Sequence, residues 1–192
     1  GMVLFHKGSI GQRLYLVESG QVRIFVLGNG GREITLDIHG PGECFGELAL
    51  LDGGPRSAGA VAMERTVAHT LERQIFLALL EAHPTLARHA LYLANQRQRH
   101  LTGLLESLAF QDIIGRVASC LLDFAAHHGQ PGEQGIVLPM HLTQGELASC
   151  VVATRESVNK VLGAFRDEGL VRHEGQVVTI LDPAGLRRKV SF

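Results

Sequence analysis

Short runs in which apolar and polar residues alternate fill the first part of the chain. Such runs predict strands with one buried face. We expect strands at residues 14–17, 21–26, 33–38, 61–63 and 67–71. Glycine-containing turns separate them, at residues 28–31 and 39–42 for example, where glycine and asparagine accept a positive φ. Many short strands at regular spacing predict a sandwich or jelly roll over residues 3–70.

The pattern changes near Glu72, after which apolar residues recur at helical spacing as far as His127. Pro84 separates two helical stretches and is expected to open the second, over residues 84–109. That helix carries a stripe with steps of three or four residues, which is typical of a two-helix coiled coil. The stripe consists of Leu93, Arg97, Leu101, Leu104 and Leu108. We predict a dimerisation helix; the alternative is that the helix packs only on its own domain.

The C-terminal part predicts two helices joined by a tight turn. Thr143 followed by Glu146 forms the pattern of a capping box, so a short helix is expected to begin there and to end around residues 151–152. Thr154 offers an N-cap for a second helix over residues 155–167. Two helices with a turn of three or four residues between them form a helix-turn-helix.

The segments on either side of this motif are predicted to be a loop and a wing. Residues 128–135 are rich in glycine and proline, which favours a loop. Residues 170–172 and 176–180 are short strand patterns around the Glu174-Gly175 turn. A strand, a tight turn and a strand in this place predict a wing.

The second helix of the motif has two different faces at about 100° per residue. The apolar face consists of Val158, Val161, Leu162 and Phe165. The polar face consists of Arg155, Glu156, Asn159 and Lys160. Its position in the first turns is where a recognition helix reaches base edges, and arginine can pair with guanine while glutamate accepts from cytosine. The alternative is an ordinary solvated face.

Charge does not by itself indicate a nucleic-acid binder, because 18 basic residues face 19 acidic ones and the net charge is −1. DNA binding therefore requires a local basic face. The 192 residues suffice for one large or two small domains. No apolar run approaches the roughly 18 residues that span a bilayer, and no signal peptide pattern is present. We expect a soluble, cytoplasmic protein with no membrane partner.

The residues that carry metal and catalytic chemistry are scattered. Cys44, Cys120 and Cys150 form no C-x-x-C pair, and the ten histidines show no ligand spacing. No set of nucleophile, base and orienting residue stands out. The sequence predicts neither a metal site nor an enzyme.

Three segments resemble the Crp/Fnr family of transcription regulators, to which the cyclic-AMP receptor protein belongs. Residues 154–162 are similar to its recognition helix and residues 108–118 to its hinge. Residues 45–50 with 55–58 are similar to its phosphate-binding cassette. The resemblance implies an α+β protein with an N-terminal cyclic-nucleotide-binding β-roll (a double-stranded β-helix or jelly roll), a long dimerisation helix and a C-terminal winged helix-turn-helix. The corresponding segments are residues 1–83, 84–111 and 112–192.

The cassette implies an effector that carries a phosphate, with cyclic AMP or cyclic GMP as candidates and cyclic AMP first. The implied ligand-binding residues are Gly46, Glu47, Leu48, Ala49, Arg56, Ser57 and Thr102. Gly46 lets the backbone approach a ligand, and the short helix after it can direct N–H groups at an anion. Arg56 can hold the cyclic phosphate by two hydrogen bonds, and Glu47 can accept from a ribose hydroxyl. The alternative is that Glu47 and Arg56 simply pair with each other.

The resemblance also implies double-stranded DNA, a second copy of the chain and RNA polymerase as partners. The implied DNA-binding residues are Thr143, Thr154, Arg155, Glu156, Ser157, Asn159 and Lys160. Relatives with arginine and glutamate at these helix positions favour a near-palindromic operator with TGTGA-like half-sites. Two alternatives stay open: a regulator of the same fold that is active without a nucleotide or senses another small molecule, and a cyclic-nucleotide-binding module of an enzyme or channel.

Several positions depart from the family pattern. Where cyclic-AMP-binding members have two adjacent hydroxyl residues, this chain has Leu101 and Thr102, which leaves the identity of the nucleotide open. Val152 replaces a frequent turn glycine, so we expect a reshaped turn. Gln176 replaces a basic wing residue and should weaken a phosphate contact there. The cysteine set of the oxygen-sensing branch is missing. The chain begins inside the family's early strand, so we expect the usual N-terminal helix to be missing and Gly1 to be an expression remnant.

Overall fold

The chain divides into two compact units. The computed structural model describes residues 1–138, 143–174 and 177–190. Unit 1 is Gly1–Leu101 and unit 2 is Thr102–Phe192, so the boundary falls inside the long helix α3 (Pro84–Phe110) and not at either of its ends.

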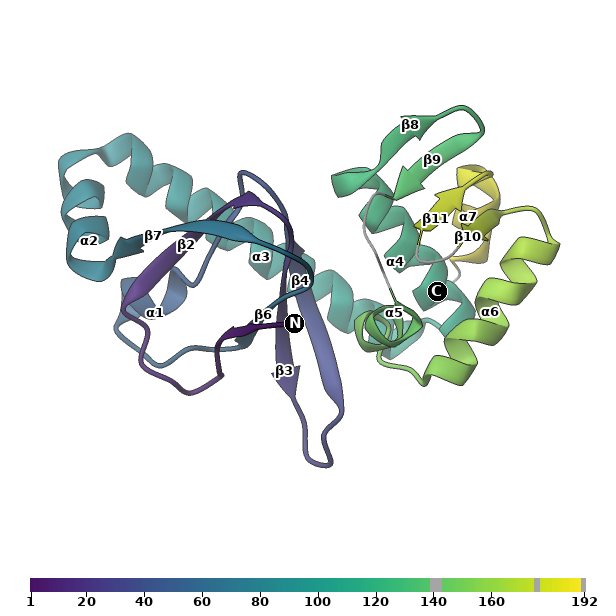
Figure 1. Ribbon diagram of the computed structural model, residues 1–192, viewed down its shortest axis with the longest axis horizontal. Coiled ribbons are helices and arrows are strands. Elements are labelled where there is room, and N and C mark those ends of the chain that lie inside the picture. The colour runs from purple at the N-terminus through teal and green to yellow at the C-terminus, as the bar shows by residue number, and fades with distance from the viewer. Residues whose placement is uncertain (139–142, 175–176, 191–192) are drawn as a thin grey trace. The chain divides into compact units, whose positions relative to one another are not determined.

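Unit 1 is built on two antiparallel sheets (Figure 1). Its strands are β1 (Val3–Phe5), β2 (Arg13–Ser19), β3 (Val22–Leu27), β4 (Glu33–His39), β5 (Cys44–Phe45), β6 (Gly59–Ala62) and β7 (Val67–Glu72). One sheet has the order β1-β6-β3-β4 and the other the order β5-β2-β7. The strands expected from the alternating pattern are confirmed, and β1 and β5 are added to them.

The core of unit 1 gathers residues from both sheets. Val17, Val22, Phe45 and Ala60 are fully buried there, and the ring of Tyr15 stacks on that of Phe45 with 5.1 Å between centroids. The simple alternation of β3 is interrupted, because its register with β4 shifts after Ile24. This irregularity is typical of a β-bulge, which re-aims the side chains that follow it.

Three helices complete unit 1, and the last of them continues into unit 2. They are α1 (Leu48–Asp52), α2 (Arg73–Ala82) and α3. The prediction that Pro84 opens a helix is confirmed, and its fixed φ explains the position. No residue of α3 is buried; Leu101 is 40% exposed, Leu105 67% and Phe110 69%. Within the described part of one chain, therefore, the apolar residues of this helix are covered only in part.

Unit 2 combines helices with one antiparallel sheet. Its elements are α4 (Ile113–His128), β8 (Gln130–Gly132), β9 (Gly135–Leu138), α5 (Gln144–Cys150), α6 (Arg155–Asp167), β10 (Val171–Glu174), β11 (Val177–Ile180) and α7 (Pro183–Lys189). The sheet has the order β10-β11-β9-β8. The predicted wing strands are confirmed, while Gly175 and Gln176 lie outside the described residues.

The loop predicted over residues 128–135 is wrong in part. The segment contains β8, which pairs with β9 through Pro131 and its partner Ile136. Proline cannot donate a backbone hydrogen bond, and strands usually exclude it for that reason. Since β8 is the edge strand of the sheet, the missing donor is tolerated.

The caps that define the helix-turn-helix are confirmed. Thr143 and Glu146 form the capping box at α5, and the Thr154 side chain accepts from the Ser157 amide at α6. The expectation that Val152 reshapes the turn is wrong, because Val152 takes the positive φ of 52° that a glycine would adopt. The chain therefore keeps the usual turn and accepts local backbone strain.

The apolar face of α6 anchors the helix to the rest of unit 2. The four apolar residues predicted for this face, Val158, Val161, Leu162 and Phe165, are all buried. α6 packs on α4, α5 and β10. None of the helices within the described ranges combines the length and apolar character that a membrane crossing requires.

Candidate effector pocket and DNA-reading surface

A pocket in unit 1 brings together most residues of the predicted cassette. Gly46, Glu47, Leu48, Ala49, Arg56 and Ser57 all line it. Gly46 has a φ of 85°, and a Cβ there would lie 2.5 Å from Nη1 of Arg56, so only glycine fits this turn. The predicted short helix after it is α1. Thr102, the remaining predicted ligand residue, does not line this pocket.

Arg56 is a buried cation without an anionic partner among the described residues. Only 4% of it is exposed. Its Nη1 donates to the Gly46 carbonyl and its Nη2 to the Arg13 carbonyl, each at 2.6 Å, whereas Nε has no partner in the described part of the chain. The guanidinium lies 4.1 Å from the centre of the Phe5 ring. Burial lowers the pKa of Arg56, which means that the site is unfavourable for the charge as it stands.

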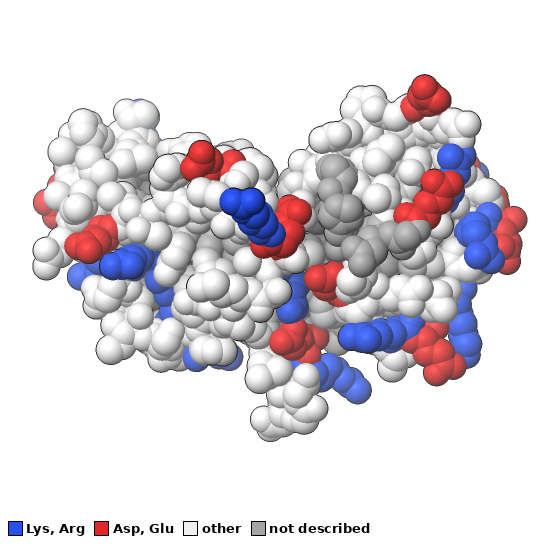
Figure 2. All heavy atoms as spheres, viewed as in Figure 1, with Lys and Arg blue, Asp and Glu red and all other residues white. Residues whose placement is uncertain are grey.

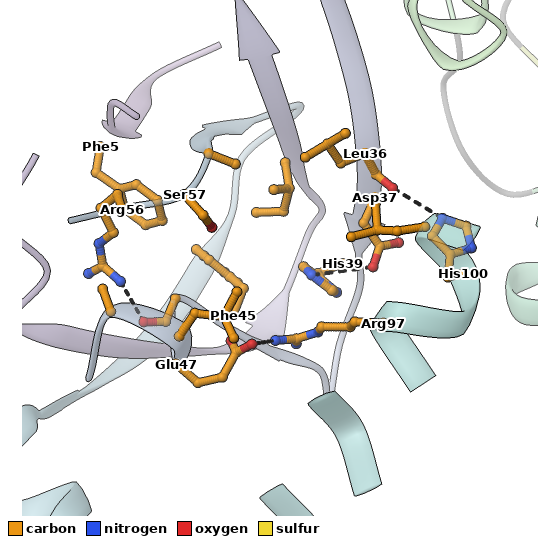
Figure 3. A pocket seen from close by; sticks show the side chains of 16 residues that line it. Phe5, Leu36, Asp37, His39, Phe45, Glu47, Arg56, Ser57, Arg97 and His100 are labelled. Atoms are coloured by element: carbon orange, nitrogen blue, oxygen red, sulfur yellow. Dashed lines mark hydrogen bonds and ion pairs between the residues drawn. The ribbon is translucent and has the colours of Figure 1, made fainter. Parts of the chain in front are cut away.

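Glu47 pairs with Arg97 of α3 and not with Arg56, so the alternative of a simple Glu47–Arg56 pair does not hold. Arg97 also donates to the carbonyl of Cys44. Burial by itself lowers the pKa of Arg97, but the charge and hydrogen bond of Glu47, together with Cys44 and Asp37, raise it overall. The carboxylate predicted to accept from a ribose is thus already held by a cation (Figure 3).

The side of the pocket next to α3 contains residues that the sequence analysis did not single out for binding. Figure 3 shows Asp37, His39 and His100 there, together with Leu36. His100 Nε2 donates to the Leu36 carbonyl at 3.1 Å. The buried His39 ring stacks on Phe45 and lies 3.7 Å from Asp37. The only feature of the sequence that could have indicated this side of the pocket was Arg97, a charged residue in an otherwise apolar stripe.

The polar face of α6 is exposed, as predicted. Arg155, Glu156, Asn159 and Lys160 are exposed, and Lys160 Nζ lies 3.0 Å from Glu156 Oε1. Such a surface pair contributes little to stability, so both side chains are available to a partner. On the face shown in Figure 2, basic and acidic side chains are interspersed and not gathered by sign.

Three of the predicted DNA-binding residues have structural tasks in the free protein. In the capping box, Thr143 Oγ1 accepts from the Glu146 amide at 3.2 Å, and the Thr143 amide donates to Glu146 Oε2 at 2.7 Å. Thr154 Oγ1 donates to Ser157 Oγ at 2.9 Å while capping α6. Their hydroxyl groups fix where the two helices begin, and this sets the position of the exposed residues that follow.

Two residues of α5 that sequence reasoning missed contact the polar face of α6. Gln144 Nε2 donates to Asn159 Oδ1 at 3.0 Å. Gly145 lies directly beneath the guanidinium of Arg155. No periodic signal indicates these contacts, since they join residues on two different helices.

Comparison with known proteins assigns a family to each part of the chain. Residues 1–83 match the cyclic nucleotide-binding domain family, and residues 115–189 match the Crp-like helix-turn-helix domain family. The chain is 39% identical over 192 residues to the cyclic AMP receptor protein of Thermus thermophilus, covering 100% of this chain and 85% of that protein. This chain belongs to the Crp family of transcription regulators. It is also 36% identical to a CRP-like cAMP-activated global transcriptional regulator of Mycobacterium tuberculosis, over 98% of this chain and 84% of the relative.

Solved structures of Crp-family members have the same fold. A CRP-family transcriptional regulator from Thermus thermophilus superposes with a TM-score of 0.79 at 33% identity, over 98% of this chain and 93% of that one. A second CRP/FNR-family regulator from the same organism has a TM-score of 0.80 at 29% identity, over 99% and 94%. The α+β fold predicted from the sequence is confirmed, and the protein is a ligand-responsive, DNA-binding transcription regulator.

Proposed function

We propose that this Crp-family protein is a cytoplasmic homodimer that binds a cyclic nucleotide in unit 1 and a near-palindromic operator through α6. The observation that carries the effector is the environment of Arg56. A buried guanidinium bonded only to neutral carbonyls gains most from an anion. A cyclic phosphate supplies one negative charge and oxygens that accept from a guanidinium fork.

The remaining groups of the pocket suit the rest of a nucleotide. Glu47 can accept from the ribose hydroxyl, in exchange for part of its interaction with Arg97. Because Arg97 belongs to α3, we expect ligand binding to shift the equilibrium between two arrangements of this helix. Relatives named for cyclic AMP make that nucleotide the first candidate. The aliphatic Leu101 at the α3 side of the pocket keeps cyclic GMP a candidate as well.

The effector is tested by isothermal titration calorimetry of the purified protein with cyclic AMP and, separately, cyclic GMP. We expect heat from one of them at micromolar to millimolar concentration, together with a rise in melting temperature, because a ligand that binds only the folded state stabilises it. Neither heat nor a melting shift with millimolar nucleotide would contradict a cyclic-nucleotide effector.

A second candidate is favoured by the Glu47–Arg97 pair. Since Glu47 already has a cationic partner, the pocket is partly satisfied without a ligand. A regulator of the same fold that is active without a nucleotide, or that senses another small molecule, agrees with this contact. DNA binding that is equally tight with and without either nucleotide would favour this candidate.

The DNA-reading proposal rests on the exposed polar face of α6. Arg155 matches the two acceptors of a guanine, Glu156 matches the amino group of cytosine, and Lys160 takes a second guanine or a phosphate. We propose half-sites similar to TGTGA, with centres about one helical turn apart, roughly 34–36 Å. RNA polymerase is the expected protein partner at such a promoter.

The operator is tested by selection from random oligonucleotides with wild type, Arg155→Ala and Glu156→Ala. We expect a near-palindrome for the wild type and a relaxed preference at one base pair of each half-site for each variant. Loss of one bidentate contact corresponds to about 1–3 kcal/mol of discrimination. A motif without two-fold symmetry, or one unchanged in both variants, would show that α6 is not the reader.

A further inference from the structure

The first turn of α5 lies against two side chains of the polar face of α6. Gln144 Nε2 donates to Asn159 Oδ1 at 3.0 Å. A Cβ at Gly145 would lie 2.7 Å from Nε and 2.8 Å from Nη2 of Arg155, which is closer than real Cβ atoms approach. The Arg155 guanidinium therefore occupies space that only a glycine leaves open.

The backbone does not explain the glycine at position 145. Gly145 is not among the residues with positive φ, so an alanine could adopt the same conformation. Glycine is also a poor helix former, and it lies in the first turn of α5. The feature that accounts for a glycine at position 145 is the guanidinium of Arg155 next to it. Arg155 has a long flexible side chain, so a larger residue at 145 would move the guanidinium and leave the helix in place.

The hydrogen bond from Gln144 orients the amide of Asn159. With Oδ1 engaged by α5, the Nδ2 donor of Asn159 is turned away from α5. An amide fixed in this way presents a donor to a purine N7, a guanine O6 or a thymine O4 in the major groove. A freely rotating amide would offer donor and acceptor alike.

We propose that Gly145 and Gln144 are positioning residues for base reading. Gly145 leaves the space in which the guanidinium of Arg155 lies, and Gln144 sets the orientation of the Asn159 amide. The proposal rests on the proposed function, in which α6 reads bases. The two residues act through side chains of α6 and need no contact with DNA. Fixing a reading group before binding reduces the entropy lost on binding and the number of sequences that it accepts.

The Gly145→Ala variant tests whether Gly145 positions the guanidinium of Arg155, and Gly163→Ala is the matched control. Gly163 is a glycine of α6 at which a Cβ would meet nothing within 4 Å. Both changes replace glycine by a better helix former, so neither should lower the melting temperature. We expect Gly145→Ala to weaken discrimination at the base pair read by Arg155 about tenfold. Gly163→Ala should keep the wild-type preference.

The orientation of Asn159 is tested by a double-mutant cycle with Gln144→Ala, Asn159→Ala and the double variant. If Gln144 acts through Asn159, the double variant should have the same base preference as Asn159→Ala alone. Additive changes would mean that Gln144 acts independently and would overturn its assigned role.

The outcomes separate this proposal from the proposed function. If the wild type selects a near-palindrome that changes in Arg155→Ala, the reading function of α6 stands. An unchanged base preference in Gly145→Ala would then overturn only the proposed role of Gly145. A lower melting temperature of Gly145→Ala that accounts for its weaker DNA binding would overturn that role as well. If the wild type selects no motif, the proposed function itself is contradicted.

Discussion

At the scale of single residues, two arginines of unit 1 have pKa values shifted in opposite directions, although burial lowers both. Among the described residues Arg56 donates only to neutral carbonyls, and burial lowers its pKa. Arg97 is also partly buried, but the Glu47 carboxylate beside it raises its pKa. The difference lies in the partner and not in the depth of burial. It distinguishes a cation that still lacks a counter-charge from one that already has it.

Arg56→Leu should abolish nucleotide binding. A cyclic phosphate would lose its buried counter-charge, which corresponds to roughly 2–5 kcal/mol for a truncated charged contact. Calorimetry with the nucleotide that binds the wild type measures the loss. Arg32→Leu, at an exposed position of the hairpin between β3 and β4, changes the net charge equally and should bind as the wild type does. Equal affinity of Arg56→Leu and wild type would rule out Arg56 as the phosphate ligand.

Arg97→Met should destabilise the protein by about 3–5 kcal/mol, because the buried Glu47 carboxylate then loses its partner. Urea unfolding measures this change. Adding Glu47→Gln removes the orphaned charge, so the double variant should be less destabilised than the two single changes predict. Strict additivity would mean that the pair contributes no coupling.

At the scale of elements, the helix-turn-helix depends on a turn that its sequence does not favour. Val152 has a φ of 52°, in a region where a β-branched side chain crowds the backbone. The surrounding contacts impose this conformation: the amide of Ala153 donates to the Ala148 carbonyl, and Val151 is buried. The caps at Thr143 and Thr154 fix the helix on each side of the turn.

Val152→Gly should raise the free energy of unfolding by about 0.5–1 kcal/mol. Relief of a left-handed conformation is worth about 1–2 kcal/mol, and the greater entropy of unfolded glycine offsets part of that gain. Urea or thermal unfolding of the full chain is the measurement. Ala153→Gly, the neighbouring change at a residue without positive φ, should instead lower stability. A Val152→Gly variant less stable than wild type would contradict the strain.

At the scale of the whole molecule, α3 presents an apolar surface that one chain leaves open. None of its 27 residues is buried; of the leucines on the predicted stripe, Leu101 is 40% exposed and Leu93, Leu104 and Leu108 are half-buried. A contiguous exposed apolar stripe usually marks an interface. The partner proposed for it is a second copy of α3, whose stripe repeats with the same spacing, and two copies would also give the operator its two-fold symmetry.

Leu104→Glu should yield monomers that bind DNA weakly, because it places a charge in the middle of the expected seam. Light scattering at micromolar concentration should give twice the 20.8 kDa of one chain for wild type and 20.8 kDa for the variant. Leu91→Glu, at an exposed leucine off the stripe, is the control and should remain dimeric. A wild-type mass of one chain would count against the dimer.

Features that depend only on neighbouring residues in the chain could be predicted from the amino-acid sequence. Pro84 opens α3, Thr143 and Thr154 cap α5 and α6, and the alternating runs of unit 1 form strands. Each follows from a local rule of backbone geometry or periodicity, which acts over a few residues. The resemblance of the cassette likewise placed Glu47 and Arg56 at one pocket.

Contacts between residues far apart in the sequence could not be predicted and follow from the three-dimensional fold. Glu47 pairs with Arg97, which is far from it in the sequence, and the guanidinium of Arg155 lies next to Gly145. β8 became a strand despite Pro131 because it lies at the edge of a sheet. Val152 kept a strained turn because contacts on both sides enforce it. Such contacts depend on the path of the backbone between distant segments, about which periodicity and local propensity carry no information.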